Sequence, residues 1–160
     1  MDGTATRRSP ALRLWNTPVG ADLGFLLARA NAISLSATHA ALEPYGLKVR
    51  SYTVLALVVT DLHPTQRELS SFLRLDPSQI VSLVDDLEQA GLVRREPDIR
   101  DRRANVVVPT SAGRDRHAQA HAAATEAEAK CFDRFSADDL ARLQTMLRTL
   151  ADAPEAGAAG

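Results

Sequence analysis

The sequence predicts a mainly α-helical protein with a small β-hairpin. Apolar residues and alanines recur at intervals of three and four along most of the chain, which is the spacing of one helix face. One pair of short valine-rich segments instead brackets a turn, which is typical of two strands. With 160 residues, the chain has room for one compact domain, or for one domain with helical extensions.

Two long helices are predicted first. Residues 20–42 and 49–60 carry the helical pattern, and the many alanines of the first segment favour a helix. Pro44 and Gly46 separate the two helices, and His63-Pro64 ends the second one.

Two shorter helices follow, and each has a capping signal. Thr65 and Glu68 have the spacing of a capping box, which starts the third helix. Asp76 caps the fourth helix and Pro77 takes its first position, where a missing N–H costs nothing. Gly91 ends this helix. The third helix is expected to turn three apolar residues inward: Leu69, Phe72 and Leu73.

The two strands come next. They are predicted at residues 92–96 and 103–108, and a turn with Pro97-Asp98 joins them. Capped helices followed by a basic hairpin have the order of a winged helix-turn-helix. In that fold one helix enters the major groove of duplex DNA, and the hairpin, or wing, lies against the backbone or the minor groove. The order of elements therefore predicts a DNA-binding module.

The fourth helix divides into two faces on a helical wheel. One face is apolar and consists of Ile80, Leu83, Val84 and Leu87. The other face presents hydroxyls, an amide and a methyl-bearing side chain suited to base edges: Ser78, Gln79, Val81 and Ser82. Asp85 and Asp86 would repel phosphates, so the C-terminal half is expected to point away from the duplex. The alternative is that this polar face is simply solvated.

The wing is predicted over residues 98–103, with the sequence Asp-Ile-Arg-Asp-Arg-Arg. Arg100, Arg102 and Arg103 are the candidates for contacts with a minor groove, where A·T tracts deepen the negative potential. The wing aspartates are expected to hold these arginine side chains in place. A solvated, charged turn is the alternative. The predicted DNA-binding set is completed by Thr65, Gln66 and Arg74.

Composition limits the remaining function classes. The net charge is only −1, so the local arginine excess of the wing has to supply the attraction to phosphate. Apolar runs are far shorter than the roughly 20 residues of a membrane span, and the single Cys131 fits a reducing cytoplasm. No catalytic motif or cofactor motif stands out, so we expect no enzyme and no cofactor. His117 and His121 have metal-binding spacing but lack further ligands nearby in sequence, so no metal site is expected.

Residues 69–113 resemble the MarR (multiple-antibiotic-resistance regulator) family of bacterial transcription factors. The most specific likeness is the DxRDRR wing, which is followed by a T-x-x-G helix start at Thr110 and Gly113. The resemblance implies a helical homodimer that binds pseudo-palindromic operators, most often as a repressor released by a small aromatic or phenolic ligand. Val81, Ser82 and Asp86 depart from the hydroxyl or basic residues more common there, and Pro109 replaces a common leucine.

The helices outside the winged module predict a dimer. Ser136 caps a sixth helix, and a chain this short can hardly cover its stripe of Leu140, Leu143, Leu147 and Leu150. A second subunit would cover it through a two-fold interface, the alternative being a monomer that folds its own termini into one bundle. The predicted organisation is an arm at 1–18, dimerisation helices at 19–47 and 111–152, the winged module at 48–110, and a tail at 153–160.

The family resemblance places an effector pocket where the dimerisation helices meet the winged module. Its candidate residues are Ser34, Thr38, His39, Arg50 and Tyr52. Cys131 is interpreted as a buried, inert thiol rather than a peroxide sensor. The competing hypothesis for the whole chain is a winged-helix module for protein–protein association that does not bind DNA.

Overall fold

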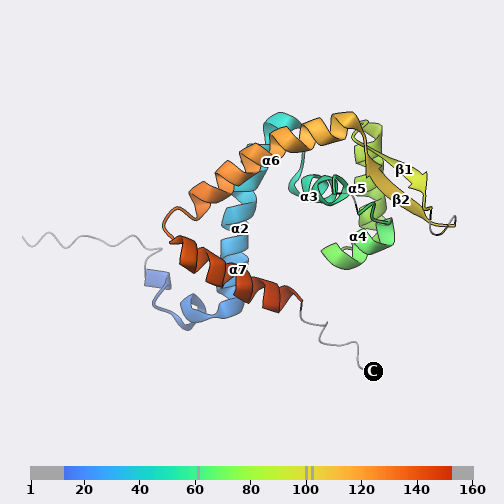
Figure 1. The fold of residues 1–160 in the computed structure, drawn as a ribbon. Coiled ribbons are helices and arrows are strands. Elements are labelled where there is room, and N and C mark those ends of the chain that lie inside the picture. The colour runs from blue at the N-terminus through green and yellow to red at the C-terminus, as the bar shows by residue number, and fades with distance from the viewer. Residues whose placement is uncertain (1–12, 61, 100, 102, 153–160) are drawn as a thin grey trace, which may run out of the picture.

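The computed structural model describes residues 13–60, 62–99, 101 and 103–152. Most of the predicted arm and tail therefore lie outside the described residues, as do Arg100 and Arg102. The predicted class, mainly α with one small hairpin, is confirmed (Figure 1). The elements are the 3₁₀ helices η1 (Pro18–Ala21) and η2 (Glu43–Tyr45), the helices α2 (Leu23–Leu42), α3 (Val49–Val58), α4 (Gln66–Leu73), α5 (Pro77–Gln89), α6 (Ser111–Cys131) and α7 (Ala137–Ala151), and the strands β1 (Val93–Pro97) and β2 (Asn105–Pro109).

The predicted capping residues lie at the ends of α4 and α5 in the winged module. Thr65 and Glu68 form both hydrogen bonds of a capping box on α4. On α5, the Asp76 carboxylate accepts from the Ser78 backbone N–H at 2.8 Å. Gly91 follows α5 with a φ of +70°, a left-handed conformation that favours glycine. These local signals therefore determine where α4 and α5 lie in the sequence.

The hairpin is shifted by one or two residues from its predicted position. Leu92 does not join the ladder, because its N–H closes the end of α5 on the carbonyl of Leu87 at 2.9 Å. Arg103 is likewise outside β2, since its N–H is bonded to the Asp101 carboxylate at 3.0 Å. The strands are antiparallel, and Arg95 faces Val107 in the register.

The core of the module lies between α3, α5 and the hairpin. Val54 and Leu55 of α3, Ile80 and Val84 of α5, and Val107 of β2 are all fully buried. The face of α5 predicted to be apolar is thus the face that packs. This packing leaves the opposite face of α5 outside the core.

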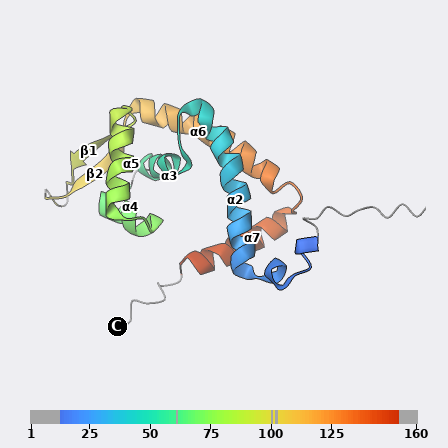
Figure 2. The same ribbon diagram turned by 180° about the vertical axis from the view of Figure 1, so that it is seen from behind.

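The helix α6 runs from the hairpin toward the far end of the molecule. Figures 1 and 2 show the winged module at one end of α6, with α7 and the N-terminal part of α2 toward the other. Small residues, among them Ala120 and Ala124, let α6 pack on its neighbours. In contrast, α7 has no buried residue.

One residue that is predicted to face inward does not. Phe72 of α4 is 74% exposed, because this short helix turns Leu69 and Leu73 toward the core and leaves Phe72 on the solvent side. Leu62 lies beyond the end of α3 and is exposed. Among the described helices, none is both long enough and apolar enough to cross a bilayer.

Candidate nucleic-acid interface

The exposed face of α5 begins at its cap. The Ser78 hydroxyl donates to the Asp76 carboxylate at 2.5 Å, in addition to the backbone bond. These two bonds hold the pKa of Asp76 below its usual value. The hydroxyl proton of Ser78 is therefore used by the cap, and only its oxygen lone pairs remain for an outside donor.

The other predicted readers lie on the surface of the same helix. Gln79 and Ser82 are exposed, and Val81 is 44% exposed although it is a large apolar residue. Together with Ser78 they form one continuous exposed strip over the first half of α5. This strip has the size and chemistry that contacts with base edges require.

Acidic residues of α5 behave differently from one another. Asp85 accepts a hydrogen bond at 2.6 Å from Arg95 Nη2 of β1, so its charge is compensated within the protein. Asp86 is exposed. Asp85 and Asp86 thus lie in the part of α5 that follows the exposed strip.

The wing arginines fall into two groups. Arg94 pairs with Glu96 of its own strand at 2.5 Å. The guanidinium of Arg95 is turned back onto α5, where it binds Asp85 and Glu88. Arg103 is exposed beside the turn. Among the described arginines of this region, Arg94 and Arg95 are therefore engaged in ion pairs, which lowers the positive charge that the hairpin has left for phosphate.

The remaining DNA-binding candidates have partners inside the protein. The Thr65 hydroxyl takes part in the capping box of α4. The Gln66 carboxamide oxygen accepts from Arg95 Nε at 3.0 Å, and its Nε2 is buried. Arg74, which has a left-handed φ of +50°, donates from Nη2 to the Ala151 carbonyl at the end of α7 at 3.2 Å. The structure thus turns Gln66 inward, away from the exposed strip of α5.

Comparison with known proteins tests the family. The MarR family model matches residues 45–104, which include the whole candidate interface. A crystal structure of a MarR-family transcriptional regulator from a Rhodococcus species is 36% identical, with a TM-score of 0.80, over 86% of this chain and 98% of that one. This chain belongs to the MarR family.

Two further relatives have a known ligand or a known function. CouR from Rhodococcus jostii, solved with p-coumaroyl-CoA, is 35% identical with a TM-score of 0.80, over 87% of this chain and 98% of that chain. An HTH-type transcriptional repressor of Mycobacterium tuberculosis is 28% identical over 81% of this chain and 94% of its own length. This MarR-family protein therefore belongs to a group of winged-helix transcription regulators.

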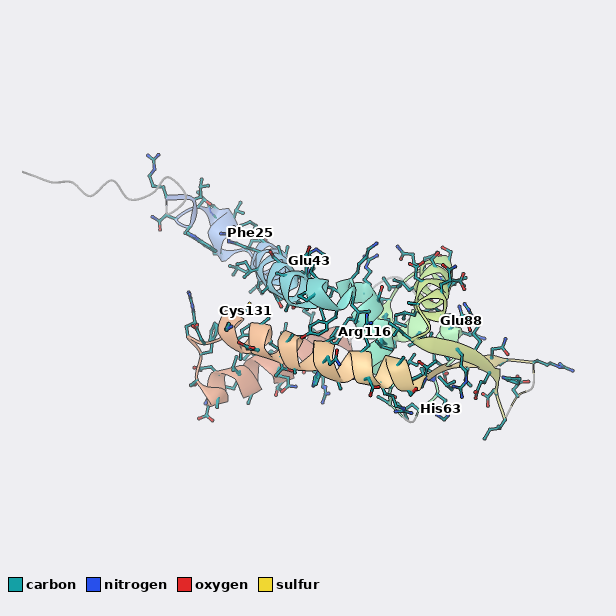
Figure 3. The ribbon with its side chains drawn as sticks, turned by 90° about the horizontal axis from the view of Figure 1, so that it is seen from above. Phe25, Glu43, His63, Glu88, Arg116 and Cys131 are labelled. Carbon is teal, nitrogen blue, oxygen red and sulfur yellow. The ribbon has the colours of Figure 1, made fainter. Side chains whose placement is uncertain are left out.

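An open groove lies between α2 and α6 of this MarR-family protein. It has a volume of about 460 Å³ and is lined by Ala37, Ala41, Ala123, Glu126, Ala127, Lys130 and Cys131. The alanines form an apolar floor, while Lys130 and Glu126 are paired to each other at 2.7 Å. In Figure 3, Cys131 lies toward the end of α6 that is far from the hairpin. Small side chains on both helices leave this space unfilled.

None of the five predicted effector residues lines that groove. Ser34 and Thr38 are half-buried on α2, where the Thr38 hydroxyl donates to the Ser34 carbonyl at 2.9 Å. His39 and Arg50 are exposed. Tyr52 is partly buried and faces α6 instead.

Tyr52 belongs to a stack that sequence spacing alone could not assemble. Its hydroxyl is 2.9 Å from His121 Nδ1, and its ring is stacked on His117 with 5.8 Å between the centroids. His117 is in turn stacked on His121 at 5.4 Å. Burial, and then the neighbouring His121, lowers the pKa of His117, while burial and then Glu128 raises the pKa of Tyr52. The described residues contain no cluster of three or more candidate metal ligands.

Proposed function

We propose that this protein is a homodimeric, ligand-responsive transcriptional repressor that inserts α5 into the major groove of an operator. The observation that carries the proposal is the exposed strip of Ser78, Gln79, Val81 and Ser82 beside the wing. One side of α5 is held by the core while the other presents this strip, which is the arrangement of a recognition helix. Residues 48–110 would form the DNA-binding domain.

Each reader has a role that its chemistry supports. Gln79 would form paired hydrogen bonds to an adenine edge, and Val81 would contact a thymine methyl. Ser82, and the free lone pairs of Ser78, would accept from base amino groups. Asp86 would stay outside the groove, because its exposed carboxylate repels phosphate.

Affinity would come mainly from the wing. Because Arg94 and Arg95 have carboxylate partners, the positive charge for phosphate would come from Arg100, Arg102 and Arg103. A hairpin with arginines fits a narrow minor groove, where the negative potential is enhanced. For Thr65, Gln66 and Arg74 the internal contacts favour a supporting role at the edge of the interface.

The dimer is supported by apolar surface that this subunit leaves uncovered. Leu23, Leu27 and Ile33 of α2 are exposed, as are Leu147 and Leu150 of α7. Large exposed apolar patches mark interaction sites in proteins of this kind. A second copy would cover them in a two-fold interface built from residues 19–47 and 111–152, and it would place two α5 helices about one DNA turn apart.

The effector would be a small aromatic compound or its thioester. CouR, which is 35% identical, was solved with p-coumaroyl-CoA. In the present chain the α2–α6 groove offers an apolar floor of alanines, and the Lys130–Glu126 ion pair lies beside that floor. Ser34 and Thr38 are half-buried on α2, and none of the candidates Ser34, Thr38, His39, Arg50 and Tyr52 lines that groove.

A salt-dependent titration tests the DNA-binding function. We expect the purified protein to bind a duplex from its own promoter region, with log K falling by about 0.9 per neutralised phosphate for each unit of log salt. Arg100→Ala together with Arg102→Ala should weaken binding to every duplex, whereas Gln79→Ala should change the preferred sequence more than the overall affinity.

Two outcomes would contradict the proposal. No binding to this duplex at low salt would favour a winged-helix module for protein association. Unchanged affinity in the double arginine variant would remove the wing from the groove. In the same assay, p-coumaroyl-CoA should release the DNA if the effector class is right.

A further inference from the structure

We propose that Arg95 is a positioning residue that fixes the wing against α5 and α4, and that it is not a phosphate contact. The inference rests on the proposed DNA-binding function, which gives the position of the wing its importance. Arg95 lies at the centre of β1, where its side chain is 21% exposed. We call Arg95 with Gln66, Asp85 and Glu88 the Arg95 network.

One guanidinium holds three partners from two helices. Its Nε donates to Gln66 Oε1 of α4 at 3.0 Å, and Nη2 donates to Asp85 Oδ1 of α5 at 2.6 Å. Nη1 donates to Glu88 Oε2, one turn further along α5. The planar, five-donor fork of arginine suits this set, and a lysine ammonium could not span it in the same way. The side chain therefore connects the wing to both helices.

The strand backbone is fixed at the same point. Glu88 also accepts from the Arg95 backbone N–H, through Oε1 at 2.9 Å. Figure 3 shows Glu88 on α5 beside the base of the hairpin. Because one carboxylate binds both the main chain and the side chain of Arg95, β1 has little freedom to slide or tilt against α5.

A second connection ties the other strand to the start of α4. The Val107 N–H donates to the Pro64 carbonyl at 2.9 Å, and Thr65 forms an isolated bridge with Val106. Gln66 follows directly and turns its carboxamide oxygen to Arg95, which leaves its buried Nε2 without a partner among the described residues. An unpaired buried donor is destabilising, so this orientation is maintained by the bond to Arg95.

The ion pairs with Asp85 and Glu88 also make Arg95 unsuitable as a phosphate contact. Its charge is opposed by two carboxylates, and a phosphate would have to displace them. Arg94 is the matched contrast one residue earlier. It is 56% exposed and pairs with Glu96 of its own strand, so it makes no connection between wing and helix through that bond.

The salt dependence of operator binding separates positioning from phosphate contact. Arg95→Met and Arg95→Lys should each weaken binding by about tenfold, the scale of a broken side-chain network. The slope of log K against log salt should not change. Loss of one phosphate contact would instead flatten that slope by about 0.9. A flattened slope, or unchanged affinity in Arg95→Met, would overturn the inference.

Hydrogen exchange without DNA tests the same inference independently. Arg95→Met should increase amide exchange in Val93–Pro97 and Asn105–Pro109, whereas the control Arg94→Met should leave it unchanged. Glu88→Gln should act in the same direction as Arg95→Met and keeps the size of the side chain, should Arg95→Met fail to fold. Equal exchange in the wild type and in both network variants would overturn the inference. If the wild type bound no DNA, only the proposed function would fail, because this measurement needs no operator.

Discussion

Gly113 of α6 packs directly against the backbone just before β1, and this contact requires a residue without a side chain. A Cβ atom placed on it would lie 1.9 Å from the Leu92 carbonyl oxygen, which is part of the backbone and cannot move aside. That same carbonyl accepts the Thr110 N–H at 3.0 Å, and the Thr110 hydroxyl accepts the Gly113 N–H at 3.0 Å. In the T-x-x-G pattern, Thr110 therefore caps α6, and Gly113 lets α6 approach the backbone of Leu92 closely.

Replacing Gly113 with alanine should destabilise the protein by about 1–3 kcal/mol, because the added methyl overpacks a backbone contact. Urea denaturation followed by circular dichroism measures this change. Gly24→Ala is the control, since its Cβ would meet only the Asp22 carboxylate oxygen, at 3.2 Å, and a side chain can shift. Equal stability of Gly113→Ala and the wild type would contradict the close contact.

At the scale of elements, the contact between α3 and α6 contains a titratable stack. His117 of α6 packs against both Tyr52 of α3 and His121, with nearly parallel rings, while the Tyr52 hydroxyl contacts His121 directly. Burial and the neighbouring imidazole both lower the pKa of His117. Since α3 belongs to the reading module and α6 leads away from it, this stack lies at the junction of the two parts.

The free energy of unfolding should fall as the pH is lowered below about 6.5, the ordinary pKa of a histidine side chain. The folded state resists protonation of His117, so the unfolded state binds more protons in this range, and stability increases with pH. Urea denaturation at pH 7.5 and pH 5.5 measures the difference. His117→Gln should reduce it, and an identical difference in that variant would assign the effect to other groups.

The partners of the hairpin arginines depend on the elements that pack around them. The sequence predicts Arg100, Arg102 and Arg103 as the DNA contacts of the hairpin, and it does not reveal what Arg94 and Arg95 do. In the structure Arg94 pairs along its strand, and only the position of α5 decides that Arg95 pairs with Asp85 and Glu88. The charge of a basic hairpin therefore overstates what the hairpin can offer to phosphate.

At the scale of the whole molecule, α7 is the element that this subunit packs least. It is a capped amphipathic helix, yet none of its residues is buried. Exposed leucines lie on α7 and on the N-terminal part of α2. The C-terminal end of α7 returns to the winged module, where Arg74 donates to the Ala151 carbonyl. Burying one leucine contributes about 1.5–3 kcal/mol, so this surface represents a large unused stabilisation.

Replacing Leu147 and Leu150 with glutamate should convert the proposed dimer to monomers, because each change occurs twice in a two-fold interface. Sedimentation equilibrium measures the oligomeric state, and a dissociation constant raised more than tenfold is expected. Leu62→Glu is the control, since this exposed leucine lies in the loop before α4. An unchanged dimer in the α7 variant would move the interface elsewhere.

Local signals in the sequence are sufficient to predict the helices, their caps, the hairpin and the exposed strip of α5. Caps, glycine stops and helical periodicity act over three or four residues, so they can be recognised without the fold. Three features depend on the packing of elements that are distant in sequence: the exposure of Phe72, the bond of Arg95 to Gln66 from 29 residues away, and the contact of Tyr52 with His121 from 69 residues away. Such pairings depend on how elements dock, and docking is set by the shape of the whole core rather than by local spacing.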